Sequence, residues 1–302
     1  MSVNKLLILG LGSIGSRYFN ILKKSKNIEI KTFDKNINLK PNFNKLNQIK
    51  NWRAKSALIC LPTYLHTSYI LKLISTGFKY ILVEKPISNN FKNLNKIKEF
   101  IKKYRVKIFV VTNMRYHPGI KLIKKHVHLV GKVTFVKAYY KNNLKNMYGK
   151  KLIGHFSNYH KLGGGILYDA CHEIDYLKYL FGPVKRSNSI AFAEKNLNAT
   201  DRFLSIIKHK SEVISTINSS FLSNKKRRGC EINGTDGTLV WSSEGSPGKE
   251  NIKVIFISKK NKIKKIYNHK NFNHNEPYAR QIEEFELMKK KKNMICQVMM
   301  TA

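Results

Sequence analysis

The chain has 302 residues, of which 42% are hydrophobic and 25% charged, a composition typical of a globular protein with one large or two ordinary domains. No apolar run reaches the roughly 18 residues that a membrane helix needs, and the four cysteines form no CxxC pair. We therefore expect no membrane span, no zinc ribbon and no disulfide scaffold, and we expect a cytoplasmic location.

The formal net charge of +39 comes from 57 basic residues, of which 48 are lysines. The lysines are spread along the chain apart from short clusters such as Lys225–Arg228, whereas nucleic-acid-binding proteins usually concentrate charge on one face. We interpret the excess as a solvated, lysine-rich surface. It predicts weak, salt-sensitive attraction to nucleic acid and no specific nucleic-acid partner.

The first third of the chain alternates short apolar runs with helical patterns, which indicates βαβ units and a parallel sheet. Helices are predicted over residues 14–24, 66–76 and 91–103. The predicted strands are Lys5–Leu9, Ile28–Phe33, Ser56–Leu61, Tyr80–Val83 and Lys107–Val111, with a weak strand and helix between residues 36 and 53.

The pattern changes after about Asn113. A helix near residues 120–128 and a strand over 132–140 lead into an irregular, Gly-rich stretch and then a helix from Ile166 to Phe181. Most of the following chain, up to a last helix over 278–290, is predicted as strands: Arg202–Lys208, Val213–Phe221, Arg228–Asn233, Thr238–Trp241, Val254–Ile257 and Ile263–Tyr267. Strands that run together after a parallel half indicate a second, α+β domain.

A GxGxxG motif leaves the first strand and opens the first helix, and Asp34 lies 19 residues beyond its last glycine, at the end of the second strand. In dinucleotide-binding proteins the glycines admit the pyrophosphate at the helix N-terminus, and the acidic residue accepts hydrogen bonds from the adenosine ribose. Asp34 also repels a 2′-phosphate, so the motif favours NAD over NADP, and Lys35 keeps that preference moderate. The predicted cofactor contacts here are Gly10, Gly12, Ser13, Ile14, Gly15 and Asp34.

Glu84, Lys85 and Pro86 follow the strand at 80–83. The carboxyl ends of parallel strands are where open α/β sheets bind their ligands. A lysine held there by a proline turn could transfer a proton or bind a substrate hydroxyl, although the spacing alone favours one exposed surface lysine among 48.

The stretch 163–175 contains two of the chain's five aspartates. At helical spacing Asp169, His172 and Asp175 share one face, and a histidine beside a carboxylate can act as a general acid or base. A metal site is an alternative, but no fourth ligand is evident, so we predict none. Acidic residues favoured at a helix N-terminus would explain Asp169 but not His172.

Together these motifs resemble the glucose–fructose oxidoreductase/inositol dehydrogenase (Gfo/Idh/MocA) family of NAD(P)-dependent oxidoreductases. The resemblance runs from Lys5 to about Phe285. It includes Leu61–His66, similar to the family's Pro-x-x-x-His, the signature Glu84–Pro86, and Asn113–Pro118, similar to its Asn-x-Arg-Phe/Tyr-x-Pro. It adds Leu61, Pro62, His66, Glu84 and Lys85 to the expected cofactor contacts.

The resemblance implies a Rossmann domain with a doubly wound parallel sheet over residues 1–115. It also implies a C-terminal α+β domain over 116–302, whose mostly antiparallel open sheet often builds homodimers or homotetramers. The implied reaction transfers a hydride between NAD (or NADP) and a hydroxyl-bearing carbon of a sugar or sugar derivative. Nucleotide sugars of surface-polysaccharide pathways are among the candidates.

The family's catalytic residues can be matched individually. Lys85 matches the lysine that contacts substrate and nicotinamide, His172 the histidine that exchanges a proton with the reacting hydroxyl, and Asp169 the aspartate near it. We expect folding to bring Lys85 and His172 to the same nicotinamide. The expected substrate contacts are Lys85, Arg115, Tyr116, Asp169 and His172.

Three features depart from the family pattern. Asp169 and His172 are three residues apart, whereas many members have four; the span 34–56 is short; and the chain stops at Ala302, which we interpret as a truncated or altered C-terminus. A non-catalytic NAD-sensing regulator and an NAD-dependent glycoside-cleaving relative remain alternatives. A regulator would be expected to have lost Lys85 or His172.

Overall fold

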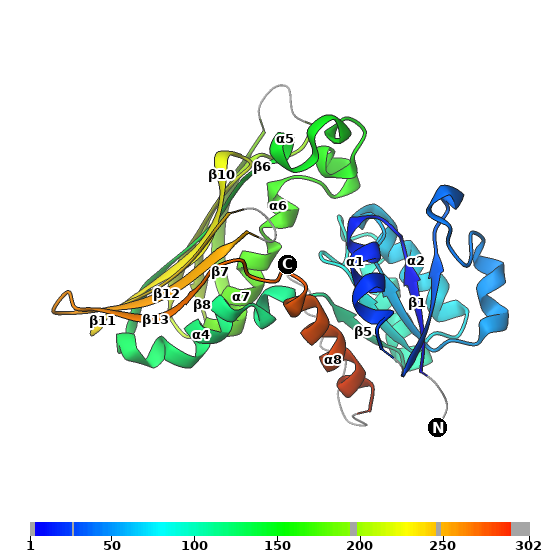
Figure 1. The fold of residues 1–302 in the computed structure, drawn as a ribbon, viewed down its shortest axis with the longest axis horizontal. Coiled ribbons are helices and arrows are strands. Elements are labelled where there is room, and N and C mark those ends of the chain that lie inside the picture. The colour runs from blue at the N-terminus through cyan, green and yellow to red at the C-terminus, as the bar shows by residue number, and fades with distance from the viewer. Residues whose placement is uncertain (1–3, 26, 194–197, 246–248, 291–302) are drawn as a thin grey trace. The chain divides into compact units, whose positions relative to one another are not determined.

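The computed structural model describes residues 4–25, 27–193, 198–245 and 249–290 (Figure 1). The chain divides into two compact units. The first comprises residues up to Val111 and the described residues from Tyr278 onward, and the second comprises Thr112–Pro277. The predicted boundary at 115/116 lies four residues beyond this division, and the last helix, expected in the second domain, falls in the first unit. The predicted change at the C-terminus lies outside the described residues.

The first unit is built on a five-stranded parallel sheet in the order β2-β1-β3-β4-β5. Its strands are β1 (Asn4–Leu9), β2 (Ile28–Phe33), β3 (Ser56–Ile59), β4 (Tyr80–Val83) and β5 (Lys107–Val110). Its helices are α1 (Ser13–Leu22), α2 (His66–Ser75), α3 (Leu94–Tyr104) and α8 (Glu276–Lys290). Strand order reverses between β1 and β3, so their carboxyl ends flank the crevice where such sheets bind ligands.

Helices cover both faces of this sheet, which confirms the predicted doubly wound arrangement (Figure 1). On one face, Leu7 of β1 lies in the same buried cluster as Ile70 of α2. On the other face, Leu6 of β1 clusters with Tyr18 of α1 and Phe285 of α8. A strand buried on both faces is apolar at nearly every position, which explains why these strands appear in the sequence as continuous apolar runs.

The weak strand and helix expected between residues 36 and 53 are reduced to less regular structure. A single parallel bridge joins Phe33 to Phe43, and the rest forms two 3₁₀ turns, Ile37–Leu39 and Leu46–Trp52. The Asn42 side chain accepts the backbone N–H of Thr32 at 2.9 Å, in place of the ladder partner that a further strand would supply. A side chain that takes over a backbone hydrogen bond in this way competes with strand formation.

The second unit contains an eight-stranded sheet in the order β13-β12-β11-β10-β6-β9-β8-β7, antiparallel except between β6 and β9. Its strands are β6 (Val133–Asn143), β7 (Val184–Phe192), β8 (Arg202–His209), β9 (Ile214–Ser220), β10 (Leu222–Gly234), β11 (Gly237–Glu244), β12 (Asn251–Ser258) and β13 (Ile263–His269). Its helices are α4 (Pro118–His126), α5 (Leu144–Tyr148), α6 (Ile166–Asp169) and α7 (Cys171–Phe181). The predicted α+β architecture with a mostly antiparallel sheet is confirmed.

One face of this sheet forms the core with the helices, and side chains such as Trp241 of β11, Ile123 of α4 and Tyr176 of α7 are fully buried there. The opposite face carries exposed apolar side chains, among them Leu204 and Ile206 of β8. In the part of the chain that the structure describes, none of the helices combines the length and apolar character of a bilayer span.

The helix predicted from Ile166 to Phe181 is interrupted at Ala170, which ends α6 and precedes α7. Ala170 has ψ near zero (φ −67°, ψ −2°), and its carbonyl accepts from the N–H of Glu173, a 3₁₀-type bond of 3.0 Å. This local tightening sets the two helices apart. Asp169 therefore belongs to α6 and His172 to α7, so they do not share the face of one continuous helix as predicted.

Candidate functional site

The GxGxxG loop has glycines for two different reasons. Gly10 has φ +89°, and a Cβ on Gly15 would lie 1.7 Å from the carbonyl oxygen of Gly10, so these two positions cannot carry side chains without rearrangement. A Cβ on Gly12 would meet nothing within 4 Å. The loop is thus packed on its inner side and open at Gly12, immediately before α1 begins at Ser13. An open backbone at a helix N-terminus is suited to a phosphate group.

Asp34 lies beside this loop, just beyond the end of β2. Its Oδ2 accepts the backbone N–H of Leu11 at 2.7 Å, and its Oδ1 accepts that of Asn36 at 2.9 Å. These bonds fix the carboxylate against the glycine loop, where its remaining lone pairs can accept ribose hydroxyls. The open Gly12, the N-terminus of α1 and the anchored Asp34 together fit the diphosphate and adenosine ribose of NAD.

The Glu84–Pro86 turn follows β4, and its Lys85–Pro86 peptide bond is cis. The Glu84 carboxylate is turned inward: its Oε1 is buried, and its Oε2 lies 3.3 Å from the backbone N–H of Lys85. Burial raises the pKa of Glu84 to about 7, against the opposing effect of the Lys85 charge. Lys85 itself is half-buried. A lysine and a carboxyl group with a raised pKa are therefore neighbours at the carboxyl edge of the sheet.

His66, expected to contact the cofactor, is 1% exposed, and both of its ring nitrogens lie within hydrogen-bond distance of backbone carbonyls of the first unit. Its Nε2 lies 2.7 Å from the carbonyl oxygen of Leu61, and its Nδ1 lies 2.8 Å from that of Pro86. Burial lowers the pKa of the His66 ring, against the opposing effect of the two carbonyls. The imidazole thus joins the loop after β3, where Leu61 and Pro62 are half-buried, to the turn that carries Lys85.

In the second unit, the glycines before α6 are required by close packing. A Cβ on Gly164 would lie 2.3 Å from the carbonyl oxygen of Phe156, and Gly165 has φ +100°. The chain emerges from them directly into α6 and the first turn of α7. Asp169 and His172 are both half-buried, at the end of α6 and near the start of α7.

Arg115 and Tyr116, expected to contact substrate, lie in a 3₁₀ turn (Asn113–Tyr116), and Tyr116 is half-buried. The Arg115 guanidinium forms a bidentate ion pair with Asp175, at 2.9 Å from Nε to Oδ2 and 2.6 Å from the terminal nitrogen to Oδ1. Its carbon also lies 5.0 Å from the centre of the Tyr179 ring. Two donors of Arg115 are therefore used within the unit, and substrate contact by its other donors stays a prediction.

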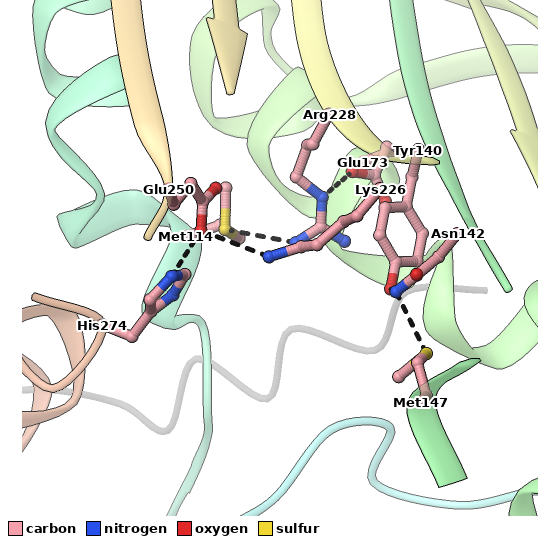
Figure 2. Close-up of polar contacts among 9 residues, drawn as sticks. All are labelled: Met114, Tyr140, Asn142, Met147, Glu173, Lys226, Arg228, Glu250 and His274. Atoms are coloured by element: carbon pink, nitrogen blue, oxygen red, sulfur yellow. Dashed lines mark hydrogen bonds and ion pairs between the residues drawn. The ribbon is translucent and has the colours of Figure 1, made fainter. Parts of the chain in front are cut away.

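A group of buried charges on the inner face of the second sheet was missed in the sequence (Figure 2). Arg228 of β10 lies 3.0 Å from Glu173 of α7, whose side chain is fully buried. Lys226 lies 3.2 Å from Glu250, which His274 also contacts. Although burial alone would raise it, these partners hold the pKa of Glu250 at about 2.

Strand periodicity is the signal that could have found two of them. Within β10, Lys225 and Arg227 are exposed, whereas Lys226 and Arg228 point to the buried face. The cluster that we interpreted as solvated surface is therefore solvated only at every second position. Among the described residues, no group of three or more His, Cys, Asp and Glu side chains is arranged to hold a metal ion.

Two family models match the chain. Residues 4–112 match the oxidoreductase family with an NAD-binding Rossmann fold, and residues 126–240 match the GFO/IDH/MocA C-terminal domain. No curated protein shows a significant match.

Solved structures share the fold at low identity. An oxidoreductase from Desulfitobacterium hafniense, described as NADPH-dependent, superposes with a TM-score of 0.82 at 15% identity, covering 98% of this chain and 91% of its own. Levoglucosan dehydrogenase in complex with NADH has a TM-score of 0.76 at 15% identity, covering 94% and 89%. WlbA dehydrogenase from Bordetella pertussis, in complex with NADH and UDP-GlcNAcA, has a TM-score of 0.71 at 18% identity, covering 80% and 78%.

The two matched models follow one another along the chain, in the order of the two units that the structure contains. The first of them covers both the open glycine loop and Asp34, the residues that fit NAD. With an NAD-binding Rossmann unit followed by this C-terminal domain, the chain belongs to the Gfo/Idh/MocA family of NAD-binding oxidoreductases.

Proposed function

We propose that this protein is a dehydrogenase or reductase that uses NAD in preference to NADP and acts on a CH–OH group of a sugar or sugar derivative, nucleotide sugars included. The observation that carries the proposal is the position of Lys85. It follows β4, in the same sheet and at the same carboxyl edge as the open glycine loop. The complexes of WlbA dehydrogenase with UDP-GlcNAcA and of levoglucosan dehydrogenase with L-sorbose and with levoglucosan support the substrate class.

In this proposal, the glycine loop and Asp34 would hold the cofactor, which as NAD⁺ would supply the hydride acceptor for oxidation and as NADH the hydride donor for reduction. The residues of the chain handle the hydroxyl proton. The Lys85 ammonium donates a hydrogen bond to the hydroxyl oxygen, and the His172 imidazole takes up the proton during oxidation and returns it during reduction. Asp169, at the end of α6, orients the reacting hydroxyl or the imidazole.

The test removes each proton-transfer group in turn. Losing one general acid or base typically lowers the rate by about 10²–10⁴-fold, so Lys85→Ala and His172→Ala should each lower kcat on that scale. The Kd for NADH should stay within a few fold, because the glycine loop and Asp34 are unchanged. If both groups serve one proton path, the double variant should lose less than the product of the two effects. A fully active His172→Ala enzyme would contradict the assignment.

The substrate class needs an assay of its own. Free sugars, sugar acids and nucleotide sugars should be tested separately with NAD and with NADP, and turnover followed by NADH or NADPH absorbance. We expect turnover with at least one sugar-type compound and a preference for NAD. An enzyme that oxidises only non-sugar alcohols would contradict the proposal.

We further propose that two copies associate through the free face of the second sheet. Ile190 of β7 pairs with Leu204 of β8, and Ile206 follows on the same face, all of them about half exposed at 54%, 45% and 53%. Burying such side chains against a second copy would remove them from water. Light scattering should find a dimer or tetramer, and Leu204→Asp with Ile206→Asp should dissociate it. A monomeric wild type would contradict this.

We place the protein in the cytoplasm. Among the described residues, Cys60, Cys171 and Cys230 form no disulfide bond, as expected in a reducing compartment. Fractionation of the cells that make the protein, with detection by antibody, tests this location. Recovery in an extracellular or membrane fraction would contradict it.

A further inference from the structure

Two arginines from outside helix α7 bind carboxylates in its first two turns. Glu173 is fully buried and lies 3.0 Å from Arg228 of β10. Two residues later, Asp175 accepts hydrogen bonds from Nε and a terminal nitrogen of Arg115, which lies in the 3₁₀ turn that precedes α4. His172, the proposed proton-transfer group, directly precedes the first of these carboxylates in the chain.

Core packing also fixes the start of α7, because Ala170 and Tyr176 are fully buried in the hydrophobic cluster of the second unit. Its N-cap residue is Ala170, which makes no side-chain hydrogen bond to the first turn. The preceding helix α6 has only four residues. The two ion pairs add charged contacts that tie the first two turns of α7 to the sheet and to the 3₁₀ turn.

Arg228 links three elements at once, as Figure 2 shows. Besides Glu173, its guanidinium carbon lies 4.0 Å from the centre of the Tyr140 ring of β6, and one terminal nitrogen lies 3.6 Å from the sulfur of Met114. Met114 is the chain neighbour of Arg115. Burial works against the charge of Arg228, but the Glu173 carboxylate outweighs this and raises the pKa of the guanidinium. Arg228 thus stays charged, and both arginines act on one small region.

We propose that Arg228 and Arg115 are positioning residues that hold the first turn of α7 and thereby orient the His172 imidazole. This inference rests on the proposed role of His172. The Arg115 guanidinium binds Asp175 with two parallel bonds, which restrict direction as well as distance. Arg228 holds the buried Glu173 through a single ion-pair contact of 3.0 Å, and both pairs are more confined than an exposed ion pair between flexible side chains. Buried ion pairs contribute little net stability compared with apolar packing, so orientation is the function that the geometry supports best.

The test uses substitutions that keep the positive charge and remove the planar guanidinium. In Arg228→Lys and Arg115→Lys we expect kcat to fall at least tenfold and the Kd for NADH to stay within twofold. The His172→Asn variant identifies the limb of the kcat–pH profile that depends on His172, and we expect both lysine variants to shift that limb along the pH axis. Lys185→Met, which breaks the exposed Lys185–Glu212 pair of the same unit, should change none of these. Unchanged kcat and pH profile in both lysine variants would overturn the proposal.

A second control separates orientation from stability. Ile232→Val trims a fully buried side chain of β10 without touching either ion pair. If Ile232→Val loses as much kcat as Arg228→Lys for the same loss of Tm, the effect is one of stability and the proposal fails.

A readout that does not depend on turnover keeps the two proposals apart. With ¹³C-labelled histidine, the ring cross-peak of His172, assigned through His172→Asn, should shift or broaden in Arg228→Lys and Arg115→Lys. An unchanged cross-peak in both would overturn the positioning role. If His172→Asn is fully active, the proposed function of His172 fails, and the cross-peak still decides whether the arginines fix its ring.

Discussion

The glycine loop allows the binding of NAD to be separated from the stability of the fold. Gly12 and Gly15 are three residues apart in one loop, yet a methyl group added to each would meet very different surroundings. At Gly12 it would project into open space, on the side where a diphosphate would approach. At Gly15 it would lie 1.7 Å from the carbonyl oxygen of Gly10. The two alanine variants should therefore fail in different ways.

The magnitudes follow from the local geometry. Gly12 has φ −66° and ψ −169°, which alanine adopts without strain, so Gly12→Ala should leave stability unchanged or raise it by about 0.4–1 kcal/mol. Its methyl group would displace the diphosphate and weaken charge-assisted amide hydrogen bonds worth about 1.5–3 kcal/mol, which is roughly 10–100-fold in Kd. Gly15→Ala overpacks the loop, and overpacking typically destabilises by about 1–3 kcal/mol, or about 2–12 °C in Tm.

Calorimetric titration with NADH and a thermal melt of the free protein measure the two effects on the same samples. We expect Gly12→Ala to bind weakly with an unchanged or higher Tm, and Gly15→Ala to melt early. Wild-type NADH affinity in Gly12→Ala would mean that the diphosphate does not approach this loop. A wild-type Tm in Gly15→Ala would refute the packing argument.

Three further outcomes are expected. Calorimetry should show that the wild type binds NAD(H) more tightly than NADP(H), and that Asp34→Ser has a smaller difference between the two affinities. Equal affinities in the wild type would contradict the proposed role of Asp34 in binding the ribose. Burial raises the pKa of Glu84 from 4.5 to about 7, so the unfolded chain loses this proton at lower pH than the folded protein and the stability of the wild type falls as pH rises between these values. The stability advantage of Glu84→Gln over the wild type in thermal melts should therefore be up to about 3 kcal/mol larger at pH 8 than at pH 5. An equal advantage at both pH values would refute this. Binding to duplex DNA should be weak and collapse between about 50 and 200 mM salt, whereas nanomolar, sequence-selective binding at physiological salt would restore a nucleic-acid role.

The first unit was predictable because its signals are local. A strand buried on both faces is apolar throughout, and a glycine motif between a strand and a helix identifies the loop that binds phosphate. The region around Asn42 was less predictable, because a side chain competes there with the backbone for the N–H of Thr32. The burial of His66 against Leu61 and Pro86 was also hidden, since it depends on two loops that meet only in the folded unit.

The second unit shows what a one-dimensional pattern leaves out. The basic cluster at 225–228 is typical of a solvated surface, and two of its four side chains, Lys225 and Arg227, are exposed. The other half is paired with carboxylates far away in the sequence, Glu173 for Arg228 and Glu250 for Lys226. Buried charges need such partners, and partners 24 residues away (Glu250) and 55 residues away (Glu173) leave no periodic signal in the sequence. Only the alternation of the strand pointed to the buried face.

The interruption at Ala170 changes the meaning of the short spacing between Asp169 and His172. Removing a residue inside a continuous helix would turn everything beyond it by about 100°, because a helix has about 3.6 residues per turn. Removing one at a joint between two helices changes only the joint. The direction of α7 is set by its buried side chains and by its two carboxylates that pair with arginines, Glu173 and Asp175, and all of these residues follow the joint. A spacing of three residues is therefore compatible with an unaltered His172, and any change in geometry falls on Asp169.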